Sequence, residues 1–558
     1  MKIFREYSQC QGLLLPPSLD EFVPEDHEAR IINDVVDAVD LSPLLAKYEG
    51  GGAPAYHPAM MLKVLIYAYS RDIYSSRRIA QSVKTDTAFM FLSGLQFPDF
   101  RTICLFRAEH ADVLPSLFVA VVRLCASLGM VGLGHIAFDG TKLKANASVR
   151  QTRDRDGLEK EIERIKEQMR QMIQASANVD EMEDLIYPDG DGSEIATELR
   201  KKEYRLKKLQ EAMEVLEREK LEKVNVTEPD SRLMKDSRGV IQPSHNGQIA
   251  VELRKKEYRL KKLQEAMKVL EREKLEKVNV TEPNSRLMKD SRGVIQPSHN
   301  GQIAVDDKEQ VIVAADVSQN ATDHAEFKPM VEQVERNLGN LPKESSADAG
   351  YSSYDNLEYA EGKGLDLYMP DNFLEALDEK EEGEKRYHKS NFKYDEERDV
   401  YVCPEGKDLK RWAEQKREGK PSLVLYRGES CRECPVRERC TTGEARTVSR
   451  DGREPLLEAM RQKLRSEEGK RIYEKRGYTV EPVFGQIKWD GRKLSMDLRG
   501  SVKVRGEFSL MCLVHNVKKI VKRVLDGTVS LPGKYSKLIE EAMLGYREEQ
   551  LTLVGAEV

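Results

Sequence analysis

The chain has 558 residues, more than one ordinary folding unit holds, so we expect about three or four units. Hydrophobic residues make up 39% and charged residues 33%, which predicts a soluble globular protein with a long charged helical segment and excludes collagen-like and low-complexity classes. The net charge of −6 alone argues against a nucleic-acid binder, but residues 471–523 hold 13 Lys and Arg against 5 Asp and Glu, and DNA attraction depends on the charge of the docking face.

The first segment, residues 1–128, is predicted to be entirely helical. Its opening apolar run is too short for a signal peptide. The longer apolar stretch at 113–138 is interrupted by Pro115 and Arg123, which favours a buried helix over a membrane span. We therefore expect a cytoplasmic protein with reduced thiols. Five basic residues of this segment suit either DNA contacts or a solvated helix face: Arg71, Arg77, Arg78, Arg101 and Arg107.

Two abutting copies of one 54-residue sequence follow, Glu198–Val251 and Glu252–Val305. They differ at only two positions, which indicates a recent tandem duplication, because the repeats of a solenoid share a pattern but drift in sequence. Each copy begins as a Lys- and Glu-rich helix, so with the upstream helix 156–175 we expect a charged helical insertion over 150–298. Four apolar residues of the first copy have the alternating spacing of three and four that is typical of a coiled-coil seam: Leu206, Leu209, Met213 and Leu216.

Each copy ends in a strand-like segment, 245–251 in the first and 299–305 in the second. Only the second is followed directly by a short polar turn and another apolar run, at 311–317. We therefore expect the second copy to form a β-hairpin with that run and to take the place in the sheet, while the spare copy loops out of the helical insertion.

The remaining segments alternate between strands and helices, which favours an α/β layer with two insertions. A polar stretch that contains cysteines separates the last helices from the rest and covers residues 375–450. Strands are predicted at 131–140, just before residue 348 and at 365–369, and helices at 325–338, 354–362 and 455–523.

Three acidic residues stand out by their context: Asp139, Asp348 and Glu481. The first two follow predicted strands, and Glu481 is expected on the first turn of a helix because Pro482 comes next. A sheet holds carboxylates at its strand ends rigidly, and their hard oxygen atoms select Mg²⁺ or Mn²⁺. Two such ions about 3.5–4 Å apart polarise both the attacking and the leaving oxygen of a phosphodiester.

The residues alone leave this interpretation open. A single aspartate at a strand end is more often a turn or cap residue, and an isolated Glu481 is more often a partner of the helix dipole. Asp316 and Asp323 in VAADVSQNATDH are rival strand-end acids, and spacing does not separate them from Asp348.

Three longer strings resemble a known family. GHIAFDGTKLKANAS, VIVAADVSQNATDHAEFKPM with ADAGYSS, and YEKRGYTVEPVFGQIK are together similar to the DDE transposases of bacterial insertion sequences, in particular the group with a YREK-type signature. The resemblance extends from the helical N-terminal segment to the C-terminal string VRGEFSLMCLVHNVKKI. It implies an α/β, RNase H-like catalytic domain: a mixed five-stranded sheet with helices on both faces.

The resemblance also implies that Asp139, Asp348 and Glu481 are the catalytic triad that holds two Mg²⁺ (or Mn²⁺) ions. In this sequence the first strand is then Gly134–Asp139, strands two and three form the hairpin Asn300–Val317, strand four ends at Asp348 and strand five is Leu365–Met369. The expected organisation is a helical DNA-binding domain at 1–128, a catalytic core at 129–149 and 299–374 completed by 451–530, the helical insertion at 150–298, a cysteine-containing insertion at 375–450 and a tail at 531–558.

Within the signature, Tyr473, Arg476, Glu481 and Lys488 take the four places. The spacing from Arg476 to Glu481 is one residue longer than usual, which makes Lys475 the alternative at that place. Lys488 follows Glu481 by two helical turns, so both project from one face and a DNA phosphate can be held there. The expected DNA contacts are Tyr473, Arg476, Lys488, Arg492, Lys493, Arg499, Lys503, Arg505, Arg77 and Arg78.

The cysteines form a second pattern. Cys403 lies in YVCPEG, and Cys431, Cys434 and Cys440 lie in CRECPVRERC. Four thiolates, two of them at C-x₂-C spacing, suit tetrahedral Zn²⁺, while free reduced thiols are the alternative because Cys403 has no close cysteine neighbour. The other four cysteines have apolar neighbours and are expected in the core: Cys10, Cys104, Cys125 and Cys512.

The resemblance implies a transposase that binds the terminal inverted repeats of an insertion sequence, cuts a phosphodiester at each end and joins the ends to target DNA. A homodimer or larger assembly on double-stranded DNA is then expected, in the cytoplasm and associated with the nucleoid. Two alternatives stay open: a remnant that binds DNA without catalysis, which the duplication motivates, and a metal-dependent nuclease of the same fold.

Overall fold

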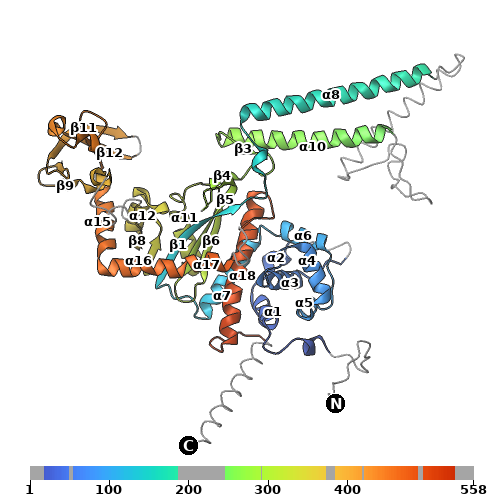
Figure 1. The fold of residues 1–558 in the computed structure, drawn as a ribbon. Coiled ribbons are helices and arrows are strands. Elements are labelled where there is room, and N and C mark those ends of the chain that lie inside the picture. Colours follow the sequence, from blue (N-terminus) through green and yellow to red (C-terminus); the bar gives the residue numbers. More distant parts are fainter. Residues whose placement is uncertain are drawn as a thin grey trace, which may run out of the picture. The chain divides into compact units, whose positions relative to one another are not determined.

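The computed structural model describes residues 18–48, 54–186, 245–290, 292–371, 384–417, 420–487 and 494–533. Two compact units are present (Figure 1). The larger consists of Met1–Val149 and Asn284–Val558, and the smaller is Arg150–Pro283.

The N-terminal part of the larger unit is helical, as predicted. Its helices begin at side-chain caps: Asp86 accepts a hydrogen bond from the backbone N–H of Ala88 at 2.8 Å, and Asp99 accepts one from Thr102 at 2.7 Å. The central helix α3 is buried on nearly all sides and organises the others around it. The elements are η1 (Leu19–Phe22), α1 (Glu28–Ala38), α2 (Ser42–Leu45), α3 (Pro58–Ser70), α4 (Ser76–Thr85), α5 (Thr87–Ser93), α6 (Phe100–Glu109) and α7 (Leu114–Ser127).

A mixed sheet lies next in the chain, again as predicted. Its strands are β1 (His135–Lys144), β4 (Arg286–Lys289), β5 (Ile295–Asp306), β6 (Ile312–Ser318), β7 (Glu344–Ala347) and β8 (Asp366–Tyr368). Strand β5 runs antiparallel to β1 and β6, whereas β7 is parallel to β1 and β8 is parallel to β7. The order across the sheet is β6-β5-β1-β7-β8, and β4 pairs with the first residues of β5.

The expectation of five strands is therefore wrong by one. Strand β5 starts at Ile295, earlier than expected, and its first four residues pair with β4. Residues Asn300–Val305 pair with β1 on one edge and with β6 on the other. Because β4 and β6 use the same edge of β5 one after the other, the sheet is five strands wide but contains six.

The second copy of the duplication supplies strand β5, as predicted, because its residues Asn300–Val305 pair with β6. The expectation of a strand at the end of the first copy is wrong. Residues 245–251 are the beginning of helix α10 (His245–Arg272), which continues into the second copy. No sheet partner follows 245–251 in the chain, whereas β6 follows 299–305 directly.

One hydrophobic core joins the N-terminal helices to the sheet and to the long C-terminal helix α18 (Ser501–Leu525). Helix α18 packs on α7 and β6, and the buried Asn516 fixes it there: its amide accepts from the Ile312 N–H at 2.9 Å and donates to the Ile312 carbonyl at 2.8 Å. Helix α11 (Phe327–Leu338) packs on β6 and α7, and α12 (Tyr354–Lys363) follows β7 in the chain.

The cysteine-containing segment forms a small antiparallel sheet of its own, with the order β13-β12-β11-β10-β9. Its core is small and largely aromatic: Phe392, Tyr401, Leu409, Tyr426 and Val448. The strands are β9 (Lys393–Asp395), β10 (Val400–Val402), β11 (Asp408–Arg417), β12 (Lys420–Gly428) and β13 (Thr447–Asp451).

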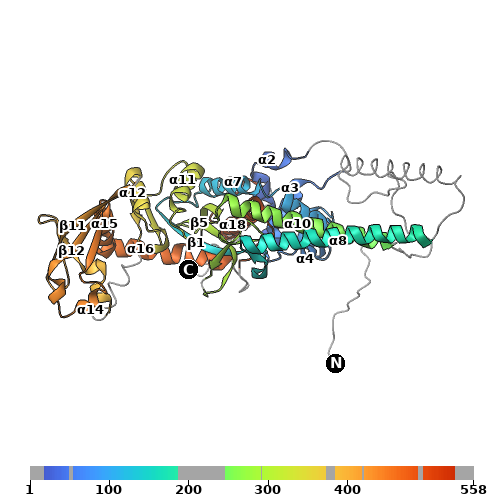
Figure 2. The same ribbon diagram turned by 90° about the horizontal axis from the view of Figure 1, so that it is seen from above.

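The smaller unit is a pair of packed helices, α8 (Arg155–Ile186) and α10, seen side by side in both views (Figures 1 and 2). Leu158 and Ile165 of α8 are buried with Leu263 and Leu270 of α10. The predicted seam of the first copy, Leu206 to Leu216, lies outside the described residues. The expected insertion, 150–298, is too long at its end, because the unit stops at Pro283 and β4 already belongs to the sheet.

Among the described residues no single helix is long and apolar enough to cross a membrane. Only α6 and α7 together meet the length and composition criteria, and they are bent by 81° where they meet. The apolar stretch predicted as a buried helix is α7, whose Leu117, Phe118 and Val122 lie in the hydrophobic core.

Candidate active site

Asp139 and Asp348 lie side by side on neighbouring parallel strands. The pairing of β1 with β7 ends at Phe138 and Ala347. The residue that follows Phe138 is Asp139, and the residue that follows Ala347 is Asp348. Asp139 was expected to be the last residue of its strand. This is wrong, because β1 continues to Lys144 along β5. It is instead the first residue of β1 after the pairing with β7 ends. The backbone N–H groups of Gly140 and Gly350 each donate to the adjacent aspartate, at 2.8 and 2.9 Å.

Glu481 is brought to the same place by two consecutive helices. Helix α16 (Glu467–Thr479) ends at a buried Val480, and α17 (Glu481–Ile487) begins at the next residue, as Pro482 predicts. Val480 and Val483 are fully buried and anchor this junction in the main core. The Glu481 side chain is 62% exposed at the start of α17.

All three carboxylates converge on the guanidinium of Arg476, which lies on α16. Its Nη2 is 3.1 Å from Asp139 Oδ2 and 3.9 Å from Asp348 Oδ2, and its Nη1 is 3.4 Å from Glu481 Oε1. Only 12% of the Arg476 side chain is exposed. Lys475, the alternative at this place of the signature, points elsewhere and pairs with Glu344 at 2.9 Å.

The negative charge of this cluster is only partly compensated. Burial raises the pKa of Asp139 to about 6, with Asp348 and Asp323 adding to the rise and Arg476 opposing it. Burial also raises the pKa of Asp348, against the lowering effect of Arg476. Buried carboxylates with raised pKa values mark a place where a further cation is favourable.

Asp323 is a fourth acid of the cluster. Sequence spacing did not separate Asp316 and Asp323 from Asp348, and the structure places Asp323, but not Asp316, beside the aspartates. Its Oδ1 accepts from the amides of Asn300 at 2.5 Å and Gln302 at 2.8 Å, both on β5, and Gln302 in turn accepts from the buried hydroxyl of Tyr351. Asp316, the other alternative acid, forms an ion pair with Arg505 at 2.6 Å.

The donor atoms suit a hard divalent cation, because the cluster offers carboxylate oxygen atoms and no nitrogen or sulfur ligand. Within the described ranges, however, no three His, Cys, Asp or Glu side chains gather closely enough to form a finished metal site. The Arg476 guanidinium occupies the space between the three carboxylates. The residues thus fit the ion in chemistry and charge, with an arginine between them.

The residues predicted to contact DNA differ in whether the structure describes them and in whether they already have a partner within the protein. Lys488, Arg492 and Lys493 lie outside the described residues. Arg499 is bound to Asn146, with 2.9 Å between its Nε and the backbone carbonyl, and Arg505 is held by Asp316.

Lys503 is exposed on the first turn of α18, and Tyr473 is partly buried against Tyr368 and Leu464.

In the N-terminal helices, Arg77 and Arg78 are exposed on α4, and Arg77 lies over the ring of Phe100. Arg107 is not available to DNA, because it is buried and donates to Tyr69, the Tyr74 carbonyl and Ser76.

The four cysteines of the second pattern line one cavity of about 30 Å³, roughly the space of a water molecule, although among the described residues no three of them lie close enough together to form a metal site. The Lys407 N–H lies 3.3 Å from the Cys403 sulfur, and Gly428 leaves room for the sulfur of Cys431. Burial raises the pKa of the Cys440 thiol, with Cys431, Cys403 and Cys434 nearby and Arg446 opposing the rise.

Of the cysteines expected in the core, Cys125 and Cys512 are buried there. Cys104 is exposed on α6, so that expectation is wrong, and Cys10 lies outside the described residues.

Comparison with known proteins gives two family matches. Residues 17–109, which include the N-terminal helices up to α6, match the family described as Transposase domain (DUF772). Residues 402–521, which contain the cysteines, Arg476 and Glu481, match the family described as Transposase DDE domain. No curated protein matches the chain. Both matched families are transposase families, and together they support a DDE transposase of an insertion sequence as the identity of this chain.

Proposed function

We propose that this transposase binds the inverted ends of an insertion sequence and catalyses metal-dependent DNA cleavage and strand transfer. The observation that carries the proposal is the convergence of Asp139, Asp348 and Glu481 on one guanidinium. Two strands and a helix supply these residues, which are separated by hundreds of positions in the chain. A structural ion pair needs only one partner for Arg476, whereas a site for phosphoryl transfer needs several carboxylates at one point.

The topology supports an RNase H-like catalytic domain. In the order β6-β5-β1-β7-β8, a hairpin and its preceding strand are followed by two parallel strands, each reached through a helix. This is the arrangement that the family resemblance implies. It places the ends of β1 and β7 next to each other, which is where the two aspartates lie.

Asp139, Asp348 and Glu481 would hold the Mg²⁺ or Mn²⁺ ions of the reaction, which supply Lewis-acid activation of the attacking and leaving oxygen atoms. The chain's own residues provide the setting. Asn300 and Gln302 hold Asp323 in place beside the aspartates, and Arg476 partly compensates the negative charge of the three carboxylates. A guanidinium at this point also suits a bidentate contact with a DNA phosphate.

The proposed partners are the double-stranded element ends and target DNA. Positive charge is concentrated in residues 471–523, which hold both Arg476 and most of α18. Joining two element ends to one target requires at least two active sites, so we propose a dimer or larger assembly on DNA, in the cytoplasm.

The test uses purified full-length protein, labelled duplexes that carry the element ends, and a supercoiled target plasmid with Mg²⁺. Joined products support the transposase, cut ends alone indicate a nuclease, and a shifted band without cleavage indicates a DNA-binding remnant. Asp139→Asn is the matched variant, because it removes one charge and keeps the shape. It is expected to abolish cleavage and to leave DNA binding intact, and retained cleavage would contradict the assignment of the triad.

We also propose that Cys403, Cys431, Cys434 and Cys440 hold a structural Zn²⁺. Their common cavity supports this, and so does the small core of the β9–β13 sheet, since domains with small cores often need a metal or another cross-link. Metal analysis of the purified protein is expected to find one zinc per chain and none after Cys431→Ser/Cys434→Ser. Absence of stoichiometric zinc in the wild type refutes this proposal.

A further inference from the structure

A second basic site lies along α18, away from the carboxylates. A cavity of about 350 Å³ opens between α18, the end of α17 and the loop that follows α3. Three lysines and a buried histidine of α18 line one side of it. The residues that carry the argument are His515, Lys518, Lys519 and Lys522 from α18 and Gln486 from α17.

The spacing of these residues places them on one face of the helix. Positions 515, 518, 519 and 522 follow the i, i+3, i+4, i+7 pattern, so the lysine side chains project into the same cavity. Lys518 and Lys522 are four residues apart, an arrangement of like charges that destabilises a helix. Repulsion of this kind is relieved when an anion lies between the two ammonium groups.

Carboxylates compensate these lysines only weakly, through the charge of Glu309 near Lys519. Within the described part of the chain none of the three forms an ion pair, and Lys519 donates to the neutral amide oxygen of Gln310 at 2.9 Å. Burial, together with the nearby Lys522, lowers the pKa of Lys519. Glu309 is near but pairs with Arg523 at 3.1 Å.

The acid that lines the cavity is Asp72, which accepts from the Tyr74 hydroxyl at 3.0 Å. Burial lowers the pKa of His515 to about 4, so this side chain is neutral at pH 7. Three ammonium groups against one carboxylate leave the cavity with an excess of positive charge.

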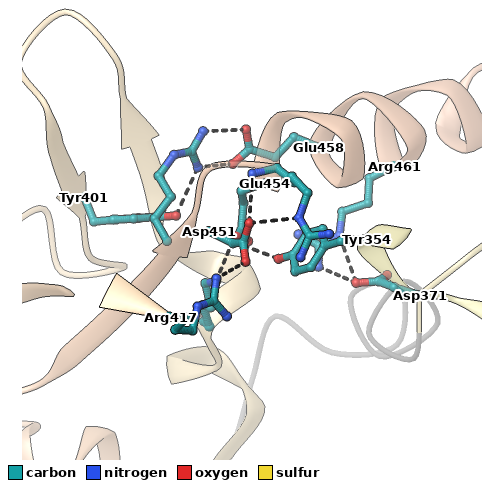
Figure 3. Close-up of polar contacts among 11 residues, drawn as sticks. Tyr354, Asp371, Tyr401, Arg417, Asp451, Glu454, Glu458 and Arg461 are labelled. Atoms are coloured by element: carbon teal, nitrogen blue, oxygen red, sulfur yellow. Dashed lines mark hydrogen bonds and ion pairs between the residues drawn. The ribbon is translucent and has the colours of Figure 1, made fainter. Parts of the chain in front are cut away.

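The larger cavity beside the β9–β13 sheet, about 820 Å³, shows the opposite situation. Two of its arginines are bound to buried carboxylates, Arg417 to Asp451 and Arg461 to Asp371 (Figure 3). The network joins this sheet to α15 (Glu454–Arg465) and already supplies these arginines with negative charge. A bound anion is favoured at the lysines of α18 and not among these arginines.

We propose that the α18 lysine cavity binds a backbone phosphate of the DNA strand that reaches the carboxylate site. This inference rests on the proposed function. Gln486 and Ile487 line the cavity and follow Glu481 by five and six residues in the same helix, so they lie about 7.5–9 Å from it along the axis of α17, at a rise of about 1.5 Å per residue. A strand whose reacting phosphodiester lies at Glu481 therefore has another phosphate near the lysines.

The test is Lys518→Gln/Lys522→Gln in the full-length protein, with binding of labelled duplexes measured by fluorescence anisotropy over a range of salt concentrations. Each lost phosphate contact reduces the slope of log K against log salt by about 0.9, so the double variant is expected to lose about one to two from the slope. The loss should be the same for element-end and unrelated duplexes, because a phosphate contact carries no sequence information.

Lys363→Gln is the control, because Lys363 pairs with Glu335 on the surface and does not line the cavity. Both altered lysines are exposed, so thermal unfolding of the double variant should match the wild type. An unchanged slope in the double variant refutes the inference while cleavage by the wild type still supports the proposed function. Protection of the wild type by inorganic phosphate, without any effect of the variant on DNA binding, also refutes it. A wild type that neither binds nor cuts DNA refutes the proposed function itself.

Discussion

Arg476 is enclosed by the carboxylates of Asp139, Asp348 and Glu481 and is almost fully buried. In the protein without metal it supplies the positive charge that keeps these acids close together. Removing one member of a buried ion pair leaves the other uncompensated, which typically costs about 3–5 kcal/mol. The stability of the site therefore depends on this single side chain until another cation arrives.

The first prediction concerns Arg476→Ala. We expect the variant to lose about 3 kcal/mol of unfolding free energy and to regain more stability from Mg²⁺ than the wild type does, because the ion replaces the lost charge. Thermal unfolding with and without Mg²⁺ measures both effects. In the control, Asp139→Asn/Arg476→Ala, the gain from Mg²⁺ should shrink, and an equal gain in all three proteins would contradict the prediction.

The second prediction concerns His515, whose ring Nε2 is 2.9 Å from the Gln310 carbonyl. Burial, reinforced by Lys519 and Lys518, lowers its pKa to about 4, whereas an unfolded chain binds the proton near pH 6.5. Below about pH 6.5 the unfolded state thus binds more protons, so this contribution is fully present above pH 6.5 and is lost as the pH falls towards 4.

The contribution amounts to at most about 3 kcal/mol. Denaturant unfolding of wild type and His515→Gln between pH 4 and 7 should show a shallower pH dependence in the variant. Some dependence should remain, because burial also lowers the pKa of His299 to about 4. Parallel stability curves for the two proteins would show that His515 does not titrate in this way.

At the scale of elements, α18 crosses the segment before α7 at very short range. A Cβ atom on Gly506 would lie 2.0 Å from the carbonyl oxygen of Ala111, so the absence of a side chain sets the distance between the two. The third prediction is that Gly506→Ala destabilises the protein by about 2–3 kcal/mol, because the backbone must move. Gly362→Ala in α12 is the control: nothing lies within 4 Å, and a gain of up to about 1 kcal/mol is expected. Equal effects of the two substitutions on thermal unfolding would contradict this packing.

Much of the element order follows from the sequence, because apolar periodicity and proline positions are local signals. Pro482 marked the start of α17, and the run at 311–317 marked the hairpin partner of the second copy. Strand β4 was missed because its four residues become a strand only by pairing with β5.

The active-site acids depended on the family resemblance, since neither the register of β1 with β7 nor the position of Asp323 is written in local spacing. A weaker signal did exist for Asp323: two amides, Asn300 and Gln302, alternate on the strand that faces it. The lysines of α18 were also visible as a helical stripe in HNVKKIVK, but the second wall of their cavity comes from α3 and α17.

At the scale of the whole molecule, the duplication adds 54 residues, and all six strands of the sheet in the described part of the chain lie outside residues 198–251. The fourth prediction is that deletion of residues 198–251 preserves unfolding temperature and any cleavage activity, because lengthening an existing insertion costs little. Deletion of 284–305 is the control, since it removes β4 and β5 and should prevent folding. Loss of folding on deletion of 198–251 would show that the first copy is required.

The same deletion can be made in the second copy, and the two products differ at only two residues. In the product that retains the first copy, the segment HNGQIAV must become the strand beside β1. The two shortened proteins are therefore expected to have equal unfolding temperatures. A large difference would show that the two residues at which the copies differ change the stability of the fold.

The segment HNGQIAV occurs twice, as the start of helix α10 at His245–Val251 and inside strand β5 at His299–Val305. The same seven residues thus adopt opposite conformations, because a helix continues directly after 245–251 whereas 299–305 is followed by its partner strand β6 and also pairs with β1. One consequence concerns mutagenesis. At Gly301 an added methyl group meets Leu143 at 2.8 Å. Gly247 belongs to helix α10, where the effect of the same substitution depends on helix propensity instead of on the contact with Leu143. The effect of a substitution in one occurrence therefore cannot be transferred to its twin.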